Sequence, residues 1–282
     1  CKVSLTTNGY FTAKAAETLL DGISEVSFSF DGLADIQNRQ RPTANGKGSF
    51  ARVFNTLKII EQKNIPYGIR LSVMDDSVDA LPENMEFLCR NTQCRTFQVE
   101  PVFKSGRARL RDNSLKDNAR FTRAFISAME IAFEHGRHMY YSGVRPWLVT
   151  SSFCMAPHEA LIVNHNNELT TCYEVYDRSH ELGDLFFYGA LNGKNEPEMD
   201  FSKRERLFQK IKSRQEACVK KGCFCFPHCA GDCPPKAFLS QENSESGFSE
   251  RCELNRELTK EMLLFYIEKS GGIWHGDKIA KQ

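Results

Sequence analysis

The first half of the chain alternates two patterns of apolar residues, one typical of strands and one typical of helices. Glu25 to Phe30 alternates polar and apolar residues with a period of two, which predicts a half-buried strand. Ser49 to Lys63 places Val53, Leu57 and Ile60 on one face, which predicts an amphipathic helix. The same patterns predict strands at Lys2 to Thr6, Tyr67 to Val73 and Thr96 to Val102, and helices at Thr12 to Leu20, Pro82 to Cys89 and Leu115 to His135. This repeated order predicts an α/β fold with a parallel sheet or barrel.

The second half has fewer regular patterns and ends in one clear helix. Arg251 to Lys269 is predicted to be helical, with an apolar stripe that faces a core. The members of this stripe are Leu254, Leu258, Met262 and Phe265. The turn-rich stretches Gly189 to Met199 and Ser240 to Ser249 are predicted to be surface loops. The distribution of cysteines predicts two domains, residues 1–149 and 150–282.

Composition and charge exclude several classes of protein. With 41% hydrophobic residues, 26% charged residues and a formal net charge of +1, the chain has ample material for a globular core. No basic stripe indicates a nucleic-acid partner, and no apolar run approaches the length of a membrane span. No apolar signal segment stands at the start. We therefore expect a cytoplasmic protein with no nucleic-acid or membrane partner.

Polar residues follow several of the predicted strands. Thr7-Asn8-Gly9 ends the first strand, Ser29 to Gly32 ends the second, and Glu100-Pro101 ends the fourth. In a parallel barrel the chemistry lies beyond these carboxyl ends. Each motif taken alone also fits an ordinary turn, since Asn-Gly and Asp-Gly tolerate positive φ. Arg70 differs because a charge inside an apolar strand needs a partner or solvent, and a salt bridge and a ligand contact are equally favoured.

The cysteines form a dense array. Eight of the eleven lie between Cys154 and Cys252, and five of these fall between Cys218 and Cys233. A disulfide framework is typical of short secreted chains and is disfavoured here. A zinc site needs only four ligands, whereas at least seven cysteines here need partners. Two iron–sulfur clusters therefore suit the array better than one zinc ion.

The motifs together resemble a known family. TTNG, SFDGLADIQNRQRPTANGKGSF, the SGRA of Ser105 to Ala108 and the cysteine array occur in that order. They look like a radical S-adenosylmethionine enzyme with a C-terminal SPASM domain. The resemblance implies a partial TIM-like β/α barrel that contains only the later strands, followed by a cysteine-rich iron–sulfur domain.

The resemblance assigns roles to individual residues. Asn8 and Gly9 would border S-adenosylmethionine, Ser29 and Asp31 would lie near its ribose, and Arg70 would hold its methionine portion. Two auxiliary 4Fe-4S clusters are implied. The first would be bound by Cys154, Cys172 and Cys233, and the second by Cys218, Cys223, Cys229 and Cys252.

Several positions depart from the family pattern. Cys225 is an extra thiol, interpreted as a buried spectator. The first cluster has three evident ligands, so its fourth site is open to substrate or filled by another residue. The histidines considered for that place are His158, His165, His180 and His228. Tyr173 stands where sulfatase-maturating members carry an aspartate, which makes that activity less favoured. Tyr173 and Glu174 are weak catalytic candidates, of which Glu174 is the better acid or base.

One family motif is missing from the printed sequence. It contains no Cys-x3-Cys-x2-Cys, the motif that binds the third, radical-generating 4Fe-4S cluster in the family. We therefore expect an N-terminally truncated fragment that is inactive alone, in preference to a protein that has lost radical chemistry.

The function implied is that of a maturase that modifies a ribosomally made peptide or protein by hydrogen abstraction. Its partners would be that substrate and an electron donor such as flavodoxin or ferredoxin. Two alternatives stay open: a non-catalytic iron–sulfur electron-relay or peptide-binding partner, and a zinc-stabilised scaffold.

Overall fold

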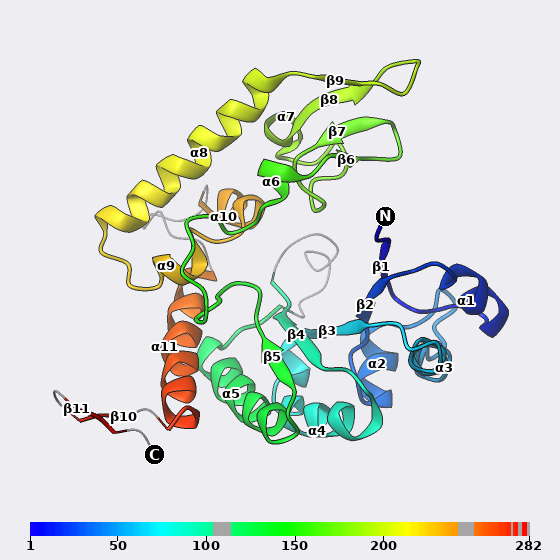
Figure 1. Ribbon diagram of the computed structural model, residues 1–282, viewed down its shortest axis with the longest axis vertical. Helices are drawn as coiled ribbons and strands as arrows, with labels where there is room; N and C mark the ends of the chain where they lie inside the picture. Colours follow the sequence, from blue (N-terminus) through cyan, green and yellow to red (C-terminus); the bar gives the residue numbers. More distant parts are fainter. Residues whose placement is uncertain (104–113, 242–250, 272, 276–277, 281–282) are drawn as a thin grey trace. The chain divides into compact units, whose positions relative to one another are not determined.

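The computed structural model describes residues 1–103, 114–241, 251–271, 273–275 and 278–280 (Figure 1). Contacts divide the chain into two compact units, one formed by Cys1–Ser142 and Glu261–Gln282 and the other by Gly143–Lys260. Each unit is described by itself. The domain boundary predicted at residue 149 stays a prediction.

The first unit is built on a five-stranded sheet. Its strands are β1 (Ser4–Thr7), β2 (Glu25–Ser29), β3 (Tyr67–Val73), β4 (Thr96–Pro101) and β5 (His138–Tyr140). They lie side by side in chain order, and every neighbouring pair is parallel. Parallel neighbours need a crossover between them, so helices stand between successive strands along the chain. The strands predicted from the period of two are confirmed, and β5 is an addition.

Five α-helices stand between the strands along the chain. They are α1 (Ala13–Leu19), α2 (Ala34–Gln40), α3 (Phe50–Gln62), α4 (Leu81–Asn91) and α5 (Asn118–Glu134), with a short 3-10 helix η1 (Asp75–Ser77) before α4. Side chains cap the starts of α1 and α5. The Asp117 carboxylate accepts from the Arg120 N–H at 2.9 Å and starts α5 three residues later than the apolar period predicted. Sequence periodicity did not predict α2.

The two faces of the sheet differ sharply. Alternate residues of the strands, among them Val26, Phe28, Ile69 and Phe97, are fully buried. A cluster of Phe30 with Phe50, Phe54 and Phe87 joins this core to α3 and α4. The opposite face carries half-buried or exposed polar residues. Parallel sheets are normally covered on both faces, so this polar face marks the place where a site can form.

The second unit contains a four-stranded antiparallel sheet and a group of helices. The strands are β6 (Ile162–Val163), β7 (Glu168–Thr170), β8 (Phe187–Leu191) and β9 (Pro197–Met199). The helices are α6 (Ala156–Glu159), α7 (Gly183–Phe186), α8 (Phe201–Lys220), α9 (Phe226–Cys229), α10 (Pro234–Gln241) and the start of α11 (Arg251–Lys269). Figure 1 shows α8 as a long helix that follows β9.

The prediction of a surface loop from Gly189 to Met199 is wrong. These residues form the β8–β9 hairpin, in which Gly189 pairs with Met199 and Leu191 with Pro197. The turn residues are confined to the tip, where Asn195 adopts a φ of 61°. Turn-rich composition therefore marked the tip and concealed its two short strands.

The C-terminal part of the chain bears on the remaining expectations. The helix Arg251–Lys269 and its buried stripe of Leu254, Leu258, Met262 and Phe265 are confirmed. Two short antiparallel strands follow it, β10 (Ile273–His275) and β11 (Lys278–Ala280). The SGRA motif and residues 242–249 of the second predicted loop lie outside the described residues. None of the described helices is both long and apolar enough to cross a membrane.

Candidate functional site

Four polar residues form one row across the inner face of the parallel sheet. Ser29 is the register partner of Arg70, Arg70 of Gln98, and Gln98 of Tyr140. Because register partners on neighbouring strands project to the same side, the four side chains share one face. The structure thereby brings together Ser29 and Arg70, which the resemblance had assigned to S-adenosylmethionine.

Hydrogen bonds extend this row along β4. The Tyr140 hydroxyl donates to the side-chain Oε1 of Gln98 at 3.2 Å, and the Gln98 Nε2 donates to the Glu100 carboxylate at 2.8 Å. The same Glu100 oxygen accepts from the Ser142 N–H at 3.0 Å. Burial, followed by the nearby Glu100 charge, raises the pKa of Tyr140. Tyr140 is therefore a neutral donor that holds Gln98 in place.

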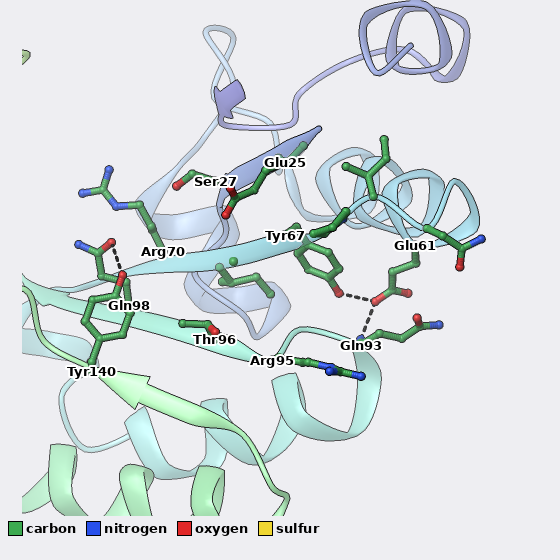
Figure 2. Close-up of a pocket in the computed structure, with 16 residues that line it drawn as sticks. Glu25, Ser27, Glu61, Tyr67, Arg70, Gln93, Arg95, Thr96, Gln98 and Tyr140 are labelled. Carbon is green, nitrogen blue, oxygen red and sulfur yellow. Dashed lines mark hydrogen bonds between the residues drawn. The ribbon is translucent and has the colours of Figure 1, made fainter. Parts of the chain in front are cut away.

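Arg70, Gln98 and Tyr140 of this row border a hollow of about 590 Å³ that is open to solvent. Figure 2 shows Arg70, Gln98 and Tyr140 at one end of it, and Glu61, Gln93 and Arg95 at the other. Glu61 is occupied structurally, because it accepts from Tyr67 at 2.5 Å, from the Gln93 N–H at 2.7 Å and from Lys58 at 2.7 Å. Arg70 is exposed and forms no ion pair within the part of the chain that the structure describes. Its charge is available to a ligand.

The end of β1 is shaped by a glycine. Gly9 has a φ of 66°, and a Cβ on it would lie 2.3 Å from the Phe28 ring. The Thr7 hydroxyl accepts from the Gly9 N–H at 3.1 Å, and the Asn8 side chain accepts from the Tyr10 N–H at 3.1 Å. The TTNG motif is therefore a tight turn that carries Asn8, an exposed residue, past the carboxyl end of the strand.

Asp31 lies in a different environment from Ser29 and Arg70. Its side chain is 1% exposed, and Arg41 donates to both carboxylate oxygens, at 2.7 and 3.1 Å. The Ser72 N–H of β3 donates to the same carboxylate at 2.9 Å. Asp31 thus ties the end of α2 to the sheet. The ribose contact stays a prediction, and in this structure the carboxylate is occupied by Arg41 and Ser72.

Five thiols line one small cavity in the second unit. They are those of Cys218, Cys223, Cys225, Cys229 and Cys252, and the cavity is also lined by Arg214 and Asn255. The four cysteines assigned by resemblance to the second cluster are all in this group. Burial raises the pKa of Cys218, the Arg214 guanidinium lowers it, and the neighbouring thiols raise it further.

Cys225 is the fifth thiol and is fully buried. Its sulfur lies 3.0 Å from the Thr259 hydroxyl and 3.5 Å from the Asn255 carbonyl oxygen. A hydrogen bond with Cys225, followed by burial, raises the pKa of Cys229. Cys225 therefore has protein partners of its own, as a spectator thiol requires, although it faces the same cavity.

The loop between Cys229 and Cys233 has an unusual backbone. Ala230, Gly231 and Asp232 have φ values of 46°, 87° and 73°, a run of left-handed residues that costs free energy at the two non-glycine positions. Cys229 ends α9 and Cys233 directly precedes α10. The left-handed run therefore reverses the chain between two cysteines that the resemblance assigns to different clusters.

Side chains from two helices hold this loop. On α8, Arg214 donates to the Gly231 carbonyl oxygen at 2.6 Å and Gln215 donates to that of Ala230 at 3.2 Å. At the start of α11, the guanidinium of Arg251 lies 3.5 Å from the carboxylate of Asp232, and both side chains are buried. These contacts stabilise the strained backbone next to the cysteines.

The other three predicted ligands have similar local surroundings. The sulfur of Cys154 accepts from the Ala156 N–H and that of Cys172 from the Glu174 N–H, each at 3.4 Å. Burial raises the pKa of Cys172, to which the neighbouring Cys154 adds. Burial, followed by Asp232, raises the pKa of Cys233 to about 12. Backbone N–H groups that point at sulfur suit thiolates that bind a cluster.

Three of the four histidines considered for the first cluster have other partners. His158 stacks on Phe208 with ring centroids 4.7 Å apart. His180 accepts from the Leu182 N–H at 3.1 Å, and His228 contacts the Leu148 carbonyl oxygen at 3.1 Å. The fourth ligand of the first set stays unassigned.

The two weak catalytic candidates differ in their surroundings. Tyr173 is 70% exposed. The Glu174 carboxylate, 41% exposed, lies 3.9 Å from the Lys236 ammonium, and its backbone N–H bonds Cys172. Glu174 is thus an accessible carboxylate beside the first cysteine set.

The cysteine cavity fits a cluster better than a single ion. A lone zinc needs its donors to converge on one point at about 2.3 Å from sulfur. Among the described residues no three His, Cys, Asp or Glu side chains converge in this way. A four-iron cluster is bound by four thiolates, each on a different iron, and five thiols line this cavity. The buried Asn255 carboxamide has no hydrogen-bond partner on either polar atom within the described residues, which also fits a group held in that cavity.

Sequence analysis did not single out Arg214 or Asn255. The signal for Arg214 was present, because Leu207, Ile211, Arg214 and Cys218 recur at helical spacing and only Arg214 is charged. Asn255 likewise follows Leu254 inside an apolar stripe. A polar residue at such a position is buried and needs a partner.

Comparisons with known proteins identify the fold. No family model matches the chain, and no curated protein matches it. Its structure is similar to native anSMEcpe with bound AdoMet, at 16% identity and a TM-score of 0.67, over 96% of this chain and 75% of that one. A histidine-tagged form of anSMEcpe with bound AdoMet gives 17% identity and a TM-score of 0.68, over 96% and 72%. Native anSMEcpe with bound AdoMet and Cp18Cys peptide gives 17% and 0.67, over 95% and 75%.

These likenesses establish a shared architecture. The predicted α/β fold with a parallel sheet is confirmed, and the chain shares the architecture of anSMEcpe.

Proposed function

We propose that this chain belongs to a radical S-adenosylmethionine maturase that modifies a ribosomally made peptide or protein by hydrogen abstraction. One observation carries the proposal: five thiols line a single cavity in a chain with the fold of anSMEcpe. That protein was solved with AdoMet and with peptides bound, which supports a cofactor and a substrate of the same classes here.

The barrel face would hold S-adenosylmethionine. S-adenosylmethionine, together with a cluster bound by the family's Cys-x3-Cys-x2-Cys motif, would supply the chemistry that abstracts hydrogen from the substrate. Arg70 would bind the cofactor's carboxylate, because its guanidinium is exposed and charge-assisted hydrogen bonds to carboxylates are strong. Ser29, its register partner, would donate from the same row. Asn8 and Gly9 would border the cofactor, and Asp31 would lie near its ribose.

The second unit would form a SPASM domain with two auxiliary 4Fe-4S clusters. Cys154, Cys172 and Cys233 would bind the first. Cys218, Cys223, Cys229 and Cys252 would bind the second. The left-handed loop held by Arg214 and Gln215 separates Cys229 from Cys233, so that the two would serve different clusters.

Glu174 is the chain's own candidate for proton transfer. Its carboxylate is accessible, lies 3.9 Å from the Lys236 ammonium, and would accept the proton from substrate. Tyr173, highly exposed beside it, offers an aromatic surface to a peptide. The other partner would be a one-electron donor such as flavodoxin or ferredoxin, in the cytoplasm.

The test is anaerobic reconstitution with iron and sulfide. We expect bound iron and sulfide with visible charge-transfer absorption, and loss of part of that iron in Cys229→Ala. Cys94→Ala is the matched control, because Cys94 is equally buried but lies in the first unit. Protein that binds stoichiometric zinc, stays colourless and takes up no iron would overturn the proposal in favour of the zinc-stabilised scaffold.

Catalysis is tested on a polypeptide that also carries the Cys-x3-Cys-x2-Cys motif. We expect formation of 5′-deoxyadenosine from S-adenosylmethionine that increases when peptide is added. Iron-loaded polypeptide that binds peptide but forms no 5′-deoxyadenosine would favour the electron-relay or peptide-binding alternative.

A further inference from the structure

Asn255 is a buried amide that has no hydrogen-bond partner for its side chain among the described residues. It lies on α11, is 1% exposed, and lines the cavity formed by the five cysteines. Neither its Nδ2 nor its Oδ1 has a hydrogen-bond partner within the described residues. A buried amide left unpaired destabilises the fold, so such a group is expected to have a partner in the working protein.

Arg214 approaches the same cavity from α8. It is 6% exposed, and its Nη2 lies 3.7 Å from the sulfur of Cys252. Charged side chains are rarely so buried without an opposite charge, and Arg214 forms no ion pair with a carboxylate in the described part of the chain. Its neighbour Gln215 holds the adjacent carbonyl of the same loop with a neutral amide. Support of the loop therefore does not by itself require a cation.

The two side chains have the same chemistry toward the cavity. Both side chains carry N–H groups, and both residues line the cavity together with five cysteines, which bind metal as thiolates. A cluster held by four thiolates carries net negative charge and bears sulfur atoms that accept hydrogen bonds. Donors to those sulfurs and nearby positive charge stabilise the reduced cluster, which is one electron more negative, and so raise its reduction potential.

We propose that Asn255 and Arg214 are positioning residues that donate hydrogen bonds to the sulfur atoms of the cluster bound by Cys218, Cys223, Cys229 and Cys252, and thereby raise its reduction potential. The inference rests on the proposed function, since it needs a cluster in this cavity. It adds the residues that set the cluster's electron affinity.

The experiment compares isosteric variants in a Cys172→Ala background, which removes a ligand of the first cluster so that the second is seen alone. Each protein is reconstituted anaerobically, assayed for iron, and titrated with dithionite while the reduced cluster is followed by electron paramagnetic resonance. Deuterium coupling after exchange into D2O reports N–H groups at the cluster. Thr259→Val is the control, because Thr259 lies one turn after Asn255, is fully buried, and bonds Cys225 without lining the cavity.

We expect the midpoint potential to move to more negative values in Asn255→Leu, further in Asn255→Asp, and also in Arg214→Gln. Arg214→Lys keeps the charge and should lie nearer the parent. The deuterium coupling should weaken in Asn255→Leu, and Thr259→Val should match the parent. If the variants hold less iron than the parent, the same role is supported by a loss that is larger in Asn255→Asp than in Asn255→Leu while Thr259→Val keeps its full iron content.

An unchanged midpoint and coupling in iron-loaded Asn255→Leu would overturn the inference and leave the proposed function intact. Equal loss of iron in Asn255→Leu and Thr259→Val would also overturn it, because both changes would then act on the fold. A parent protein that binds no iron would instead overturn the proposed function.

Discussion

Arg41 and Asp31 form a bidentate ion pair just beyond the carboxyl end of β2, next to β3. The guanidinium donates to both carboxylate oxygens, at 2.7 and 3.1 Å, and Asp31 is buried while Arg41 is 30% exposed. The pair also fixes the Ser72 N–H of β3. A residue predicted to touch the cofactor thus already has a structural role.

Asp31→Ala is expected to lower the free energy of unfolding of the protein by about 2–4 kcal/mol. The change leaves the partly buried Arg41 guanidinium and the Ser72 N–H without their acceptor. Urea unfolding followed by circular dichroism measures this free energy. Asp76→Ala is the control: it breaks the exposed Arg39–Asp76 pair, with side chains 49% and 58% exposed, and should cost less than about 0.5 kcal/mol. Equal effects of the two changes would contradict a structural role for Asp31.

Gly9→Ala is expected to destabilise the protein more than Gly22→Ala. Both glycines have positive φ, but a Cβ would meet only open space at Gly22 and would lie 2.3 Å from Phe28 at Gly9. We expect about 1 kcal/mol for Gly22→Ala from backbone strain alone and about 2 kcal/mol or more for Gly9→Ala.

Phe28→Leu, which shortens the side chain that Gly9→Ala would strike, completes a double-mutant cycle with it. We expect a favourable coupling of about 1 kcal/mol, because the double variant relieves the overlap. Additive effects would show that the close approach of Gly9 to Phe28 does not limit this position.

Stability should fall as the pH rises above 9 because of two buried thiols. Burial raises the pKa of Cys89 to about 11 and that of Cys94 to about 12, from an ordinary value of 9.0. Below pH 9 both thiols are protonated in the folded and unfolded chain, and their contribution is fully present. Between pH 9 and each folded pKa only the unfolded chain ionises, so each thiol removes about 1.4 kcal/mol per pH unit.

Cys94→Ala should therefore make the unfolding free energy fall less steeply between pH 9 and 11 than in the parent protein. Urea midpoints at pH 8, 9, 10 and 11 measure the slope. Burial, the Glu61 hydrogen bond and the Cys94 charge raise the pKa of Tyr67, so the slope above pH 10 also contains a Tyr67 contribution that differs between the two proteins. Parallel curves would show that Cys94 ionises in the folded state.

Arg70→Ala should weaken S-adenosylmethionine binding by about ten-fold or more while leaving stability within about 0.5 kcal/mol, because an exposed guanidinium without an ion pair contributes little to folding. Calorimetric titration of the anaerobically reconstituted protein measures the affinity. Arg95→Ala removes the same charge at the other end of the hollow and should bind like the parent. Equal affinities for S-adenosylmethionine in the parent, Arg70→Ala and Arg95→Ala would show that Arg70 does not bind the cofactor.

Local sequence patterns predicted most of the first unit and less of the second. Strands β2 to β4 and helices α3 to α5 have clear apolar periods and long runs, so local side-chain spacing is enough to identify them. The strands β6 to β9 are two to five residues long, too short for a period to show. Their pairing decides their structure, which is why the β8–β9 hairpin was mistaken for a loop.

The sequence by itself determined the order of strands β1 to β4 and of helices α1, α3, α4, α5 and α11. It also placed Gly9 at the end of a strand and Arg70 inside one, and it grouped the cysteines. These follow from local spacing and from the chemistry of single residue types. Only the tertiary structure decided that Ser29, Arg70, Gln98 and Tyr140 share a row, that Arg41 occupies Asp31, and that Arg214 and Asn255 reach one cavity. Each of these depends on register and on contacts between segments far apart in the chain, which no local pattern encodes.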